Sequence, residues 1–125
     1  MSKGIVFDKQ GDLYWHTKAN LAHGRAIAYL ERHLGGHPAF VPVFANRDVW
    51  NSMDAWYFDK ISIDGLRKMQ RVLGQMMAEL PTVLKDINSE EMKFICEQEL
   101  FRLREVLGMR IEQLEADTKA KPSNS

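Results

Sequence analysis

Cysteine is almost absent from this sequence, since Cys96 is the only one among 125 residues. A single thiol cannot form an intramolecular disulfide, so the fold does not depend on oxidation. Cys96 falls on the apolar face of a predicted helix, and no neighbour in the sequence would activate a thiolate. We therefore expect a buried structural thiol and no nucleophile at this position.

Net charge is also absent, because 17 basic side chains balance 17 acidic ones. Nucleic-acid binding depends on neutralising phosphates with lysine and arginine, so the balance argues against nucleic acid as a partner. A local basic cluster does occur at Arg67, Lys68 and Arg71, on the first turns of a predicted helix. We interpret this cluster as a solvated helix face.

Long apolar runs are missing as well. No stretch reaches the roughly 18 apolar residues that a membrane-spanning helix needs. The N-terminal residues also lack the apolar run of a signal peptide. We expect a soluble cytoplasmic protein with no membrane partner.

Catalytic motifs cannot be recognised, whether a phosphate loop, GxGxxG, HExxH or a Ser/Cys–His–Asp signature. His33 and His37 flank a Gly-Gly turn, and His16 or His23 could join them in a zinc site or a small metal-dependent enzyme. No rigid spacing and no cysteine accompany these histidines. This hypothesis therefore ranks third, and we expect no catalytic residue, no metal ligand and no cofactor.

Two long amphipathic helices are the clearest feature that is present, at about residues 64–84 and 89–116. Apolar residues recur every three or four positions in both, which gives each helix one apolar stripe. Pro81 predicts a kink or a new start in the first helix. Asn88 and Glu91 fit a capping box at the start of the second helix.

The first part of the chain is aromatic and irregular by comparison. All three tryptophans, all three tyrosines and four of the six phenylalanines precede residue 59. Strand-like runs at 5–7 and 13–16 flank the turn-forming residues 8–12, which predicts a β-hairpin. A helix capped by Thr17 should follow, to about residue 34.

Three further short elements are expected before the long helices. Residues 40–44 are β-prone, but Pro42 restricts them to an edge strand or an extended loop. Residues 46–53 should form a turn or a short helix, and residues 55–58 another strand. The sequence thus predicts an α+β fold, with a small N-terminal antiparallel sheet and one helix, followed by a long C-terminal antiparallel helical hairpin.

We assign residues 1–117 to a single domain, with an aromatic-rich part over 1–62 and the helical hairpin over 63–117. Residues 118–125 are polar and should form a disordered tail. The regular half suits a scaffold or an association surface. Irregular segments that are held on a scaffold more often carry recognition.

Five residues near the middle of the chain form the candidate partner- or ligand-binding set. They are Arg47, Trp50, Trp56, Tyr57 and Phe58. Tryptophan, tyrosine and arginine dominate protein-binding hot spots, and the same residues can stack a base while arginine pairs with a phosphate. The alternative is that these aromatic residues pack the sheet against the helices.

The last helix has an apolar surface too wide for one partner helix to cover. Its candidate self-association residues are Phe101, Val106, Met109, Ile111 and Leu114. A four-helix association in a twofold dimer would bury this surface. The alternative is a monomer in which the N-terminal half covers it.

The leading functional hypothesis is a non-enzymatic, protein-binding regulator, adaptor or inhibitor. It would form a homodimer through its C-terminal helices and contact a protein partner through its aromatic N-terminal half. The second hypothesis is a protein that binds a small ligand, such as a nucleotide, in an aromatic and arginine pocket. The metal-dependent enzyme comes third.

Overall fold

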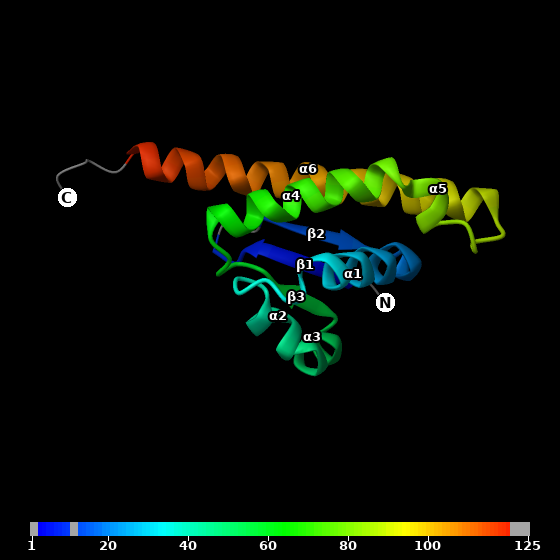
Figure 1. The fold of residues 1–125 in the computed structure, drawn as a ribbon, viewed down its shortest axis with the longest axis horizontal. Helices are drawn as coiled ribbons and strands as arrows, with labels where there is room; N and C mark the ends of the chain where they lie inside the picture. Colours follow the sequence, from blue (N-terminus) through cyan, green and yellow to red (C-terminus); the bar gives the residue numbers. More distant parts are fainter. Residues whose placement is uncertain (1–2, 11–12, 121–125) are drawn as a thin grey trace.

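The computed structural model describes residues 3–10 and 13–120, and it has the α+β architecture that the sequence predicts (Figure 1). The elements in chain order are β1 (Lys3–Asp8), β2 (Leu13–Thr17), α1 (Asn20–Leu34), α2 (Val41–Ala45), α3 (Arg47–Met53), β3 (Ala55–Tyr57), α4 (Ile63–Ala78), α5 (Leu80–Val83) and α6 (Glu90–Ala120). Gly11 and Asp12, in the predicted hairpin turn, lie outside the described residues.

The sheet has the strand order β2-β1-β3. β1 and β2 form the predicted antiparallel hairpin, in which Ile5 lies opposite Trp15. β3 instead runs parallel to β1, with Trp56 opposite Ile5. The sheet is therefore mixed, and the prediction of an antiparallel sheet holds for the hairpin alone. The chain between β1 and β3 contains the three helices α1 to α3, which supply the long crossover that a parallel pair requires.

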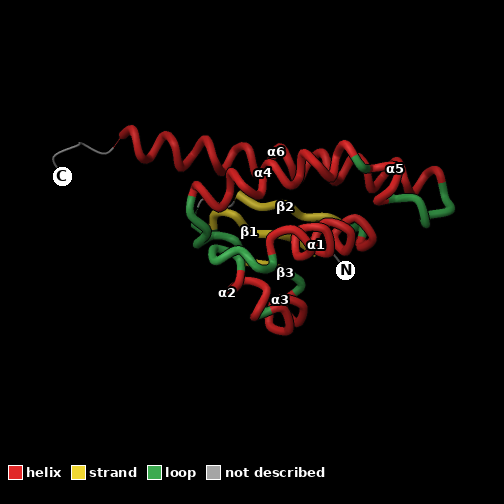
Figure 2. Tube along the Cα trace, in the orientation of Figure 1, coloured by secondary structure: helices red, strands yellow, loops and turns green. Residues whose placement is uncertain are grey.

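One face of the sheet is buried and the other is accessible, as alternating side chains require. Ile5, Phe7 and Trp15 on the buried face have no exposed surface, whereas Tyr14 on the opposite face is half exposed. α1, α4 and α6 form the helical layer (Figure 2). The indole nitrogen of Trp15 donates a hydrogen bond of 2.9 Å to the main-chain oxygen of Glu99, which joins the hairpin to the first third of α6.

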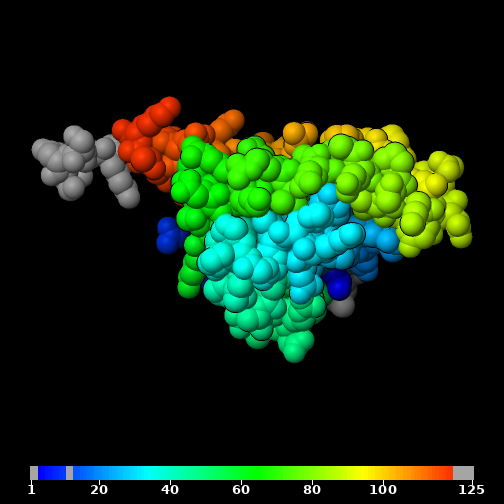
Figure 3. Space-filling model, viewed as in Figure 1, coloured from blue at the N-terminus to red at the C-terminus, as the bar shows by residue number. Residues whose placement is uncertain are grey.

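The predicted helical hairpin is present in α4 and α6, with α5 inserted at its tip (Figure 1). Arg67 near the start of α4 pairs with Glu115 near the end of α6, at 2.9 Å, so the two helices run antiparallel. Pro81 lies in the first turn of α5, where its missing N–H needs no helical partner. This is the new helical start that the sequence predicts. Figure 3 shows α1 and α4 side by side on one surface of the molecule.

Residues 40–44 are the clearest error in the predicted elements. Residues 41–44 lie in helix α2, with Phe40 as its N-cap, instead of forming an edge strand or an extended loop. Pro42 lies in the first turn of α2, where its missing N–H needs no helical partner. The proline that excludes a central strand is therefore compatible with a short helix. The apolar residues of this run still reach the core, since Phe40 is fully buried and Phe44 is 7 % exposed.

The start and end of α6 also differ from the prediction. The side chain of Ser89, and not that of Asn88, accepts a hydrogen bond from the N–H of Met92 at 3.1 Å. The main-chain oxygen of Ser89 accepts from Lys93 as well, so the cap lies one residue later than predicted. The helix continues to Ala120, through the first residues of the predicted tail, and residues 121–125 lie outside the described chain.

Candidate functional site

The five predicted binding residues divide between the core and the surface. Trp56 is 2 % exposed and packs against Phe44, with ring centroids 5.6 Å apart. Phe58 is fully buried and meets Phe7 edge to face at 6.1 Å. Both side chains therefore fill the core, where a partner cannot reach them. Tyr57 lies between them in sequence and points to the other face of the sheet, where it is partly accessible.

Arg47 lies apart from the other candidates. Its guanidinium forms an ion pair with Glu31 of α1, and both side chains remain substantially exposed. Arg47 does not line the cavity that Trp50 and Tyr57 share. The predicted pairing of this arginine with a phosphate beside the aromatic rings therefore has no geometric basis.

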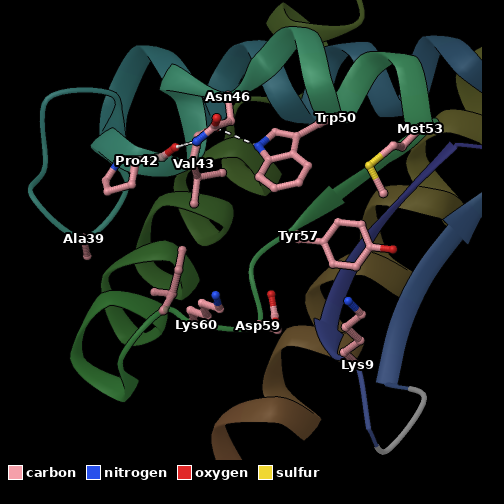
Figure 4. A pocket seen from close by; sticks show the side chains of 11 residues that line it. Lys9, Ala39, Pro42, Val43, Asn46, Trp50, Met53, Tyr57, Asp59 and Lys60 are labelled. Atoms are coloured by element: carbon pink, nitrogen blue, oxygen red, sulfur yellow. Dashed lines mark hydrogen bonds between the residues drawn. The ribbon is translucent and has the colours of Figure 1, made fainter.

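Trp50 and Tyr57 line a groove of about 540 Å³ that is open to solvent (Figure 4). The α2–α3 segment forms one wall, while the segment after β3 and the end of β1 form the other. The side chains of the groove are those of Lys9, Ala39, Pro42, Val43, Asn46, Trp50, Met53, Tyr57, Asp59, Lys60 and Ile61. The α2–α3 wall is mainly apolar, and the charged side chains belong to the opposite wall.

Hydrogen bonds fix the apolar wall in place. The indole nitrogen of Trp50 donates to the main-chain oxygen of Val43 at 2.8 Å, and the Asn46 amide donates to that of Pro42 at 2.7 Å. The Trp50 ring centroid lies 5.5 Å from that of Tyr57, at an interplanar angle of 42°. These contacts hold the two rings before any ligand arrives, which reduces the entropy lost on binding.

The reversal of the chain after α3 brings Tyr57 opposite Trp50. Asp54 ends α3 in the left-handed conformation, at φ 56°, and its main-chain oxygen accepts a hydrogen bond from Gly4 at 3.1 Å. Aspartate tolerates this conformation better than most residues with a side chain. The turn therefore directs the chain from α3 straight into β3 beside β1.

Lysine side chains supply the positive charge of the groove. The Lys9 ammonium lies 5.4 Å from the centroid of the Tyr57 ring, within the range of a cation–π interaction. Lys60 is exposed on the same wall, beside Asp59. Within residues 3–10 and 13–120, neither lysine lies within 4 Å of a carboxylate oxygen in an ion pair. The sequence pattern did not single out either residue.

No protein-family model, characterised protein or solved structure matches the chain significantly. The geometry of the molecule therefore carries the functional argument. In the part of the chain that the structure describes, no three or more His, Cys, Asp or Glu side chains gather in a way that would hold a metal ion. No described helix combines the length and hydrophobicity needed to cross a bilayer.

The candidate self-association residues of α6 lie at different depths. Met109 is 52 % exposed and Phe101 is 39 % exposed, whereas Val106 and Ile111 are buried in the core of the single chain. Leu114 is partly buried against that core. Another large apolar side chain of the same helix, Phe94, has 63 % of its surface exposed.

Proposed function

We propose that the protein is a non-enzymatic binding protein that recognises a protein partner through the groove beside Trp50 and Tyr57. The observation that carries this proposal is an accessible pair of aromatic side chains in mutual contact, in a groove with one mainly apolar wall. Tryptophan and tyrosine in such pockets contribute much of the energy of protein interfaces. A groove that is open along one side accepts a side chain from a larger molecule without enclosing it.

A small ligand remains the second candidate. The groove could take a nucleotide, whose planar base can stack on an aromatic ring and whose phosphate can pair with the ammonium groups of Lys9 and Lys60. In this version Lys9 and Lys60 take the phosphate-binding role first given to Arg47. The open form of the groove favours the protein partner, because ligand pockets usually enclose most of a small molecule.

Cross-linking at the groove tests the partner proposal in the native host. A photoreactive residue replaces Met53, which lines the groove and is half exposed, and in a control replaces Lys68 on the surface of α4. We expect a discrete protein adduct from position 53, no equivalent adduct from position 68, and loss of the first adduct in a Trp50→Ala background. An adduct that persists unchanged with Trp50→Ala, or no adduct at position 53, contradicts the proposal.

Self-association through α6 is the second part of the proposed function. Phe94, Phe101 and Met109 are spaced by seven and eight residues, so they lie along one side of the helix. Exposed apolar side chains grouped in this way are typical of interaction surfaces. A second copy packed on this side in a twofold arrangement would cover the same residues on both chains.

Sedimentation of the purified chain tests the dimer. We expect wild-type protein at high micromolar concentration to be dimeric, and Phe101→Asp and Met109→Asp to be folded monomers. Val49→Asp is the matched control, because Val49 is 49 % exposed on α3, away from this helix. Ile111→Asp would place a charge in the core and unfold the chain, so it is unsuitable as a test. A monomeric wild-type protein would refute this part of the proposal.

A further inference from the structure

A polar network behind the groove determines which charges face into it. The Asp8 carboxylate accepts a hydrogen bond of 2.8 Å from the Gln113 amide and lies 3.9 Å from the Arg110 guanidinium. The side chains of Arg110 and Asp8 are 12 % and 15 % exposed. Oδ2 of Asp8 is therefore directed towards α6, while Oδ1 accepts a hydrogen bond of 3.0 Å from the main-chain N–H of Gln10 in the turn after β1.

Arg110 also contacts the loop after β3, which contributes Asp59 and Lys60 to the charged wall of the groove. Its Nη2 donates to the main-chain oxygen of Asp59 at 3.2 Å, which ties the loop after β3 to α6. The residues that follow these two tethered aspartates are Lys9 and Lys60, and both line the groove. Because β1 and β3 are parallel, their C-terminal ends lie at the same end of the sheet. The lysines that follow the two strands therefore lie on one wall of the groove.

The groove consequently presents two ammonium groups and one carboxylate, that of Asp59, opposite an apolar wall (Figure 4). Its local charge is positive although the chain as a whole has none. An occupant that matches this surface needs an apolar side chain to lie against Trp50 and a negative group next to it. A basic occupant would leave the lysines without compensation and meet like charge.

We propose that the groove binds an extended segment of a protein partner in which an aromatic or large aliphatic side chain is flanked by a carboxylate. This inference rests on the binding role proposed above and specifies the chemistry of the partner. The apolar side chain packs against the exposed surfaces of Trp50 and Tyr57, whose rings are already in contact with each other, and the carboxylate lies near Lys9 and Lys60. Arg110 is a positioning residue, because it acts through Asp8 and Asp59 without lining the groove.

Peptide titration provides the test. The probes are three capped pentapeptides with a central phenylalanine, flanked on both sides by aspartate, by asparagine or by lysine, and free phenylacetate as a small aromatic carboxylate. Binding to the full chain is followed by NMR on the indole N–H signal of Trp50, up to millimolar concentrations. We expect the aspartate peptide to bind at least about fivefold more tightly than the asparagine peptide, the lysine peptide to bind most weakly, and phenylacetate to bind more weakly than the aspartate peptide.

Neutral substitutions separate the charge of the groove from its apolar surface. Lys9→Gln and Lys60→Gln should each weaken the aspartate peptide about two- to fivefold, the range of an exposed ion pair, and leave the asparagine peptide unchanged. The difference between the two peptides should also shrink as salt is raised. Lys68→Gln on α4 is the matched control and should change neither affinity.

The outcomes distinguish this inference from the proposed function. Equal affinities for the aspartate and asparagine peptides overturn the charge preference but leave the groove as an apolar binding site. Phenylacetate binding as tightly as the aspartate peptide overturns the extended segment in favour of a small ligand. If no peptide binds while the cross-link from Met53 forms, the inference fails and the partner proposal survives. If no peptide binds and no cross-link forms from position 53, the inference and the partner proposal are both refuted.

Discussion

The imidazole of His23 gives the fold an acid sensitivity that can be measured. His23 is 4 % exposed and stacks on the buried Trp15, with ring centroids 6.1 Å apart. Its Nε2 has no hydrogen-bond partner among the described residues. Burial, and secondarily the charge of Lys3, lower the pKa of His23 from 6.5 to about 4. Hydrogen bonding to the main chain of Gly4 and the charge of Asp54 raise the pKa of His23, but by less than burial and Lys3 lower it.

The sign of the effect follows from comparing the two states. Above pH 6.5 the imidazole is neutral in both, and the free energy of unfolding is unaffected. Below pH 6.5 His23 is protonated in the unfolded chain, whereas in the folded chain it stays neutral down to about pH 4. Acid therefore favours unfolding over this interval. The shift in pKa corresponds to about 3 kcal/mol over this interval, of which about 2 kcal/mol are lost by pH 5.

Urea denaturation at pH 7 and pH 5 measures this loss. Wild-type protein should lose about 2 kcal/mol more than His23→Gln between the two pH values, because the variant lacks the titrating group while other groups titrate in both. The imidazole proton signals of His23 should also stay at their neutral position down to about pH 4. Equal losses in the two proteins, or a His23 signal that titrates near pH 6.5, would refute the reasoning.

Four further substitutions have expected effects on the midpoint of urea unfolding. Ser89→Ala should destabilise the fold by about 1 kcal/mol and Asn88→Ala by much less, since Ser89 caps α6. A larger loss of stability in Asn88→Ala than in Ser89→Ala would show that Asn88 is the cap. Gly24→Ala should stabilise α1 by about 0.5–1 kcal/mol, because a Cβ there meets nothing within 4 Å, and a lowered midpoint would contradict this. Gly65→Ala should destabilise the fold, because its Cβ would lie 2.7 Å from the Ile61 side chain; an unchanged midpoint would show that this contact relaxes.

The helical half was predictable because its signal is local. Apolar spacing within residues 63–117 is enough to define α4 and α6, and the effect of Pro81 depends only on its own missing N–H. Residues 40–44 were mispredicted for a local reason too. A short apolar run containing proline suits either an edge strand or the first turn of a helix, and its length does not distinguish the two.

The groove could be predicted only in part. Trp50 and Tyr57 were identified, but so were the buried Trp56 and Phe58. The two-residue period of a strand separates Tyr57 from its neighbours, provided that β3 is known to have one buried face. Lys9 and Lys60 could not be predicted, because they come to line the same groove only when β3 joins β1 in parallel, and that pairing depends on the intervening helices.

The hydrogen bond from the Trp15 indole to Glu99 joins residues 84 apart in the chain. During synthesis the hairpin leaves the ribosome before α6, so the Trp15 indole is exposed and its N–H donates to water until Glu99 becomes available. The tethers from Arg110 to the groove also come from this last helix. The nascent chain therefore completes the groove only after α6 has been synthesised and has packed against the sheet.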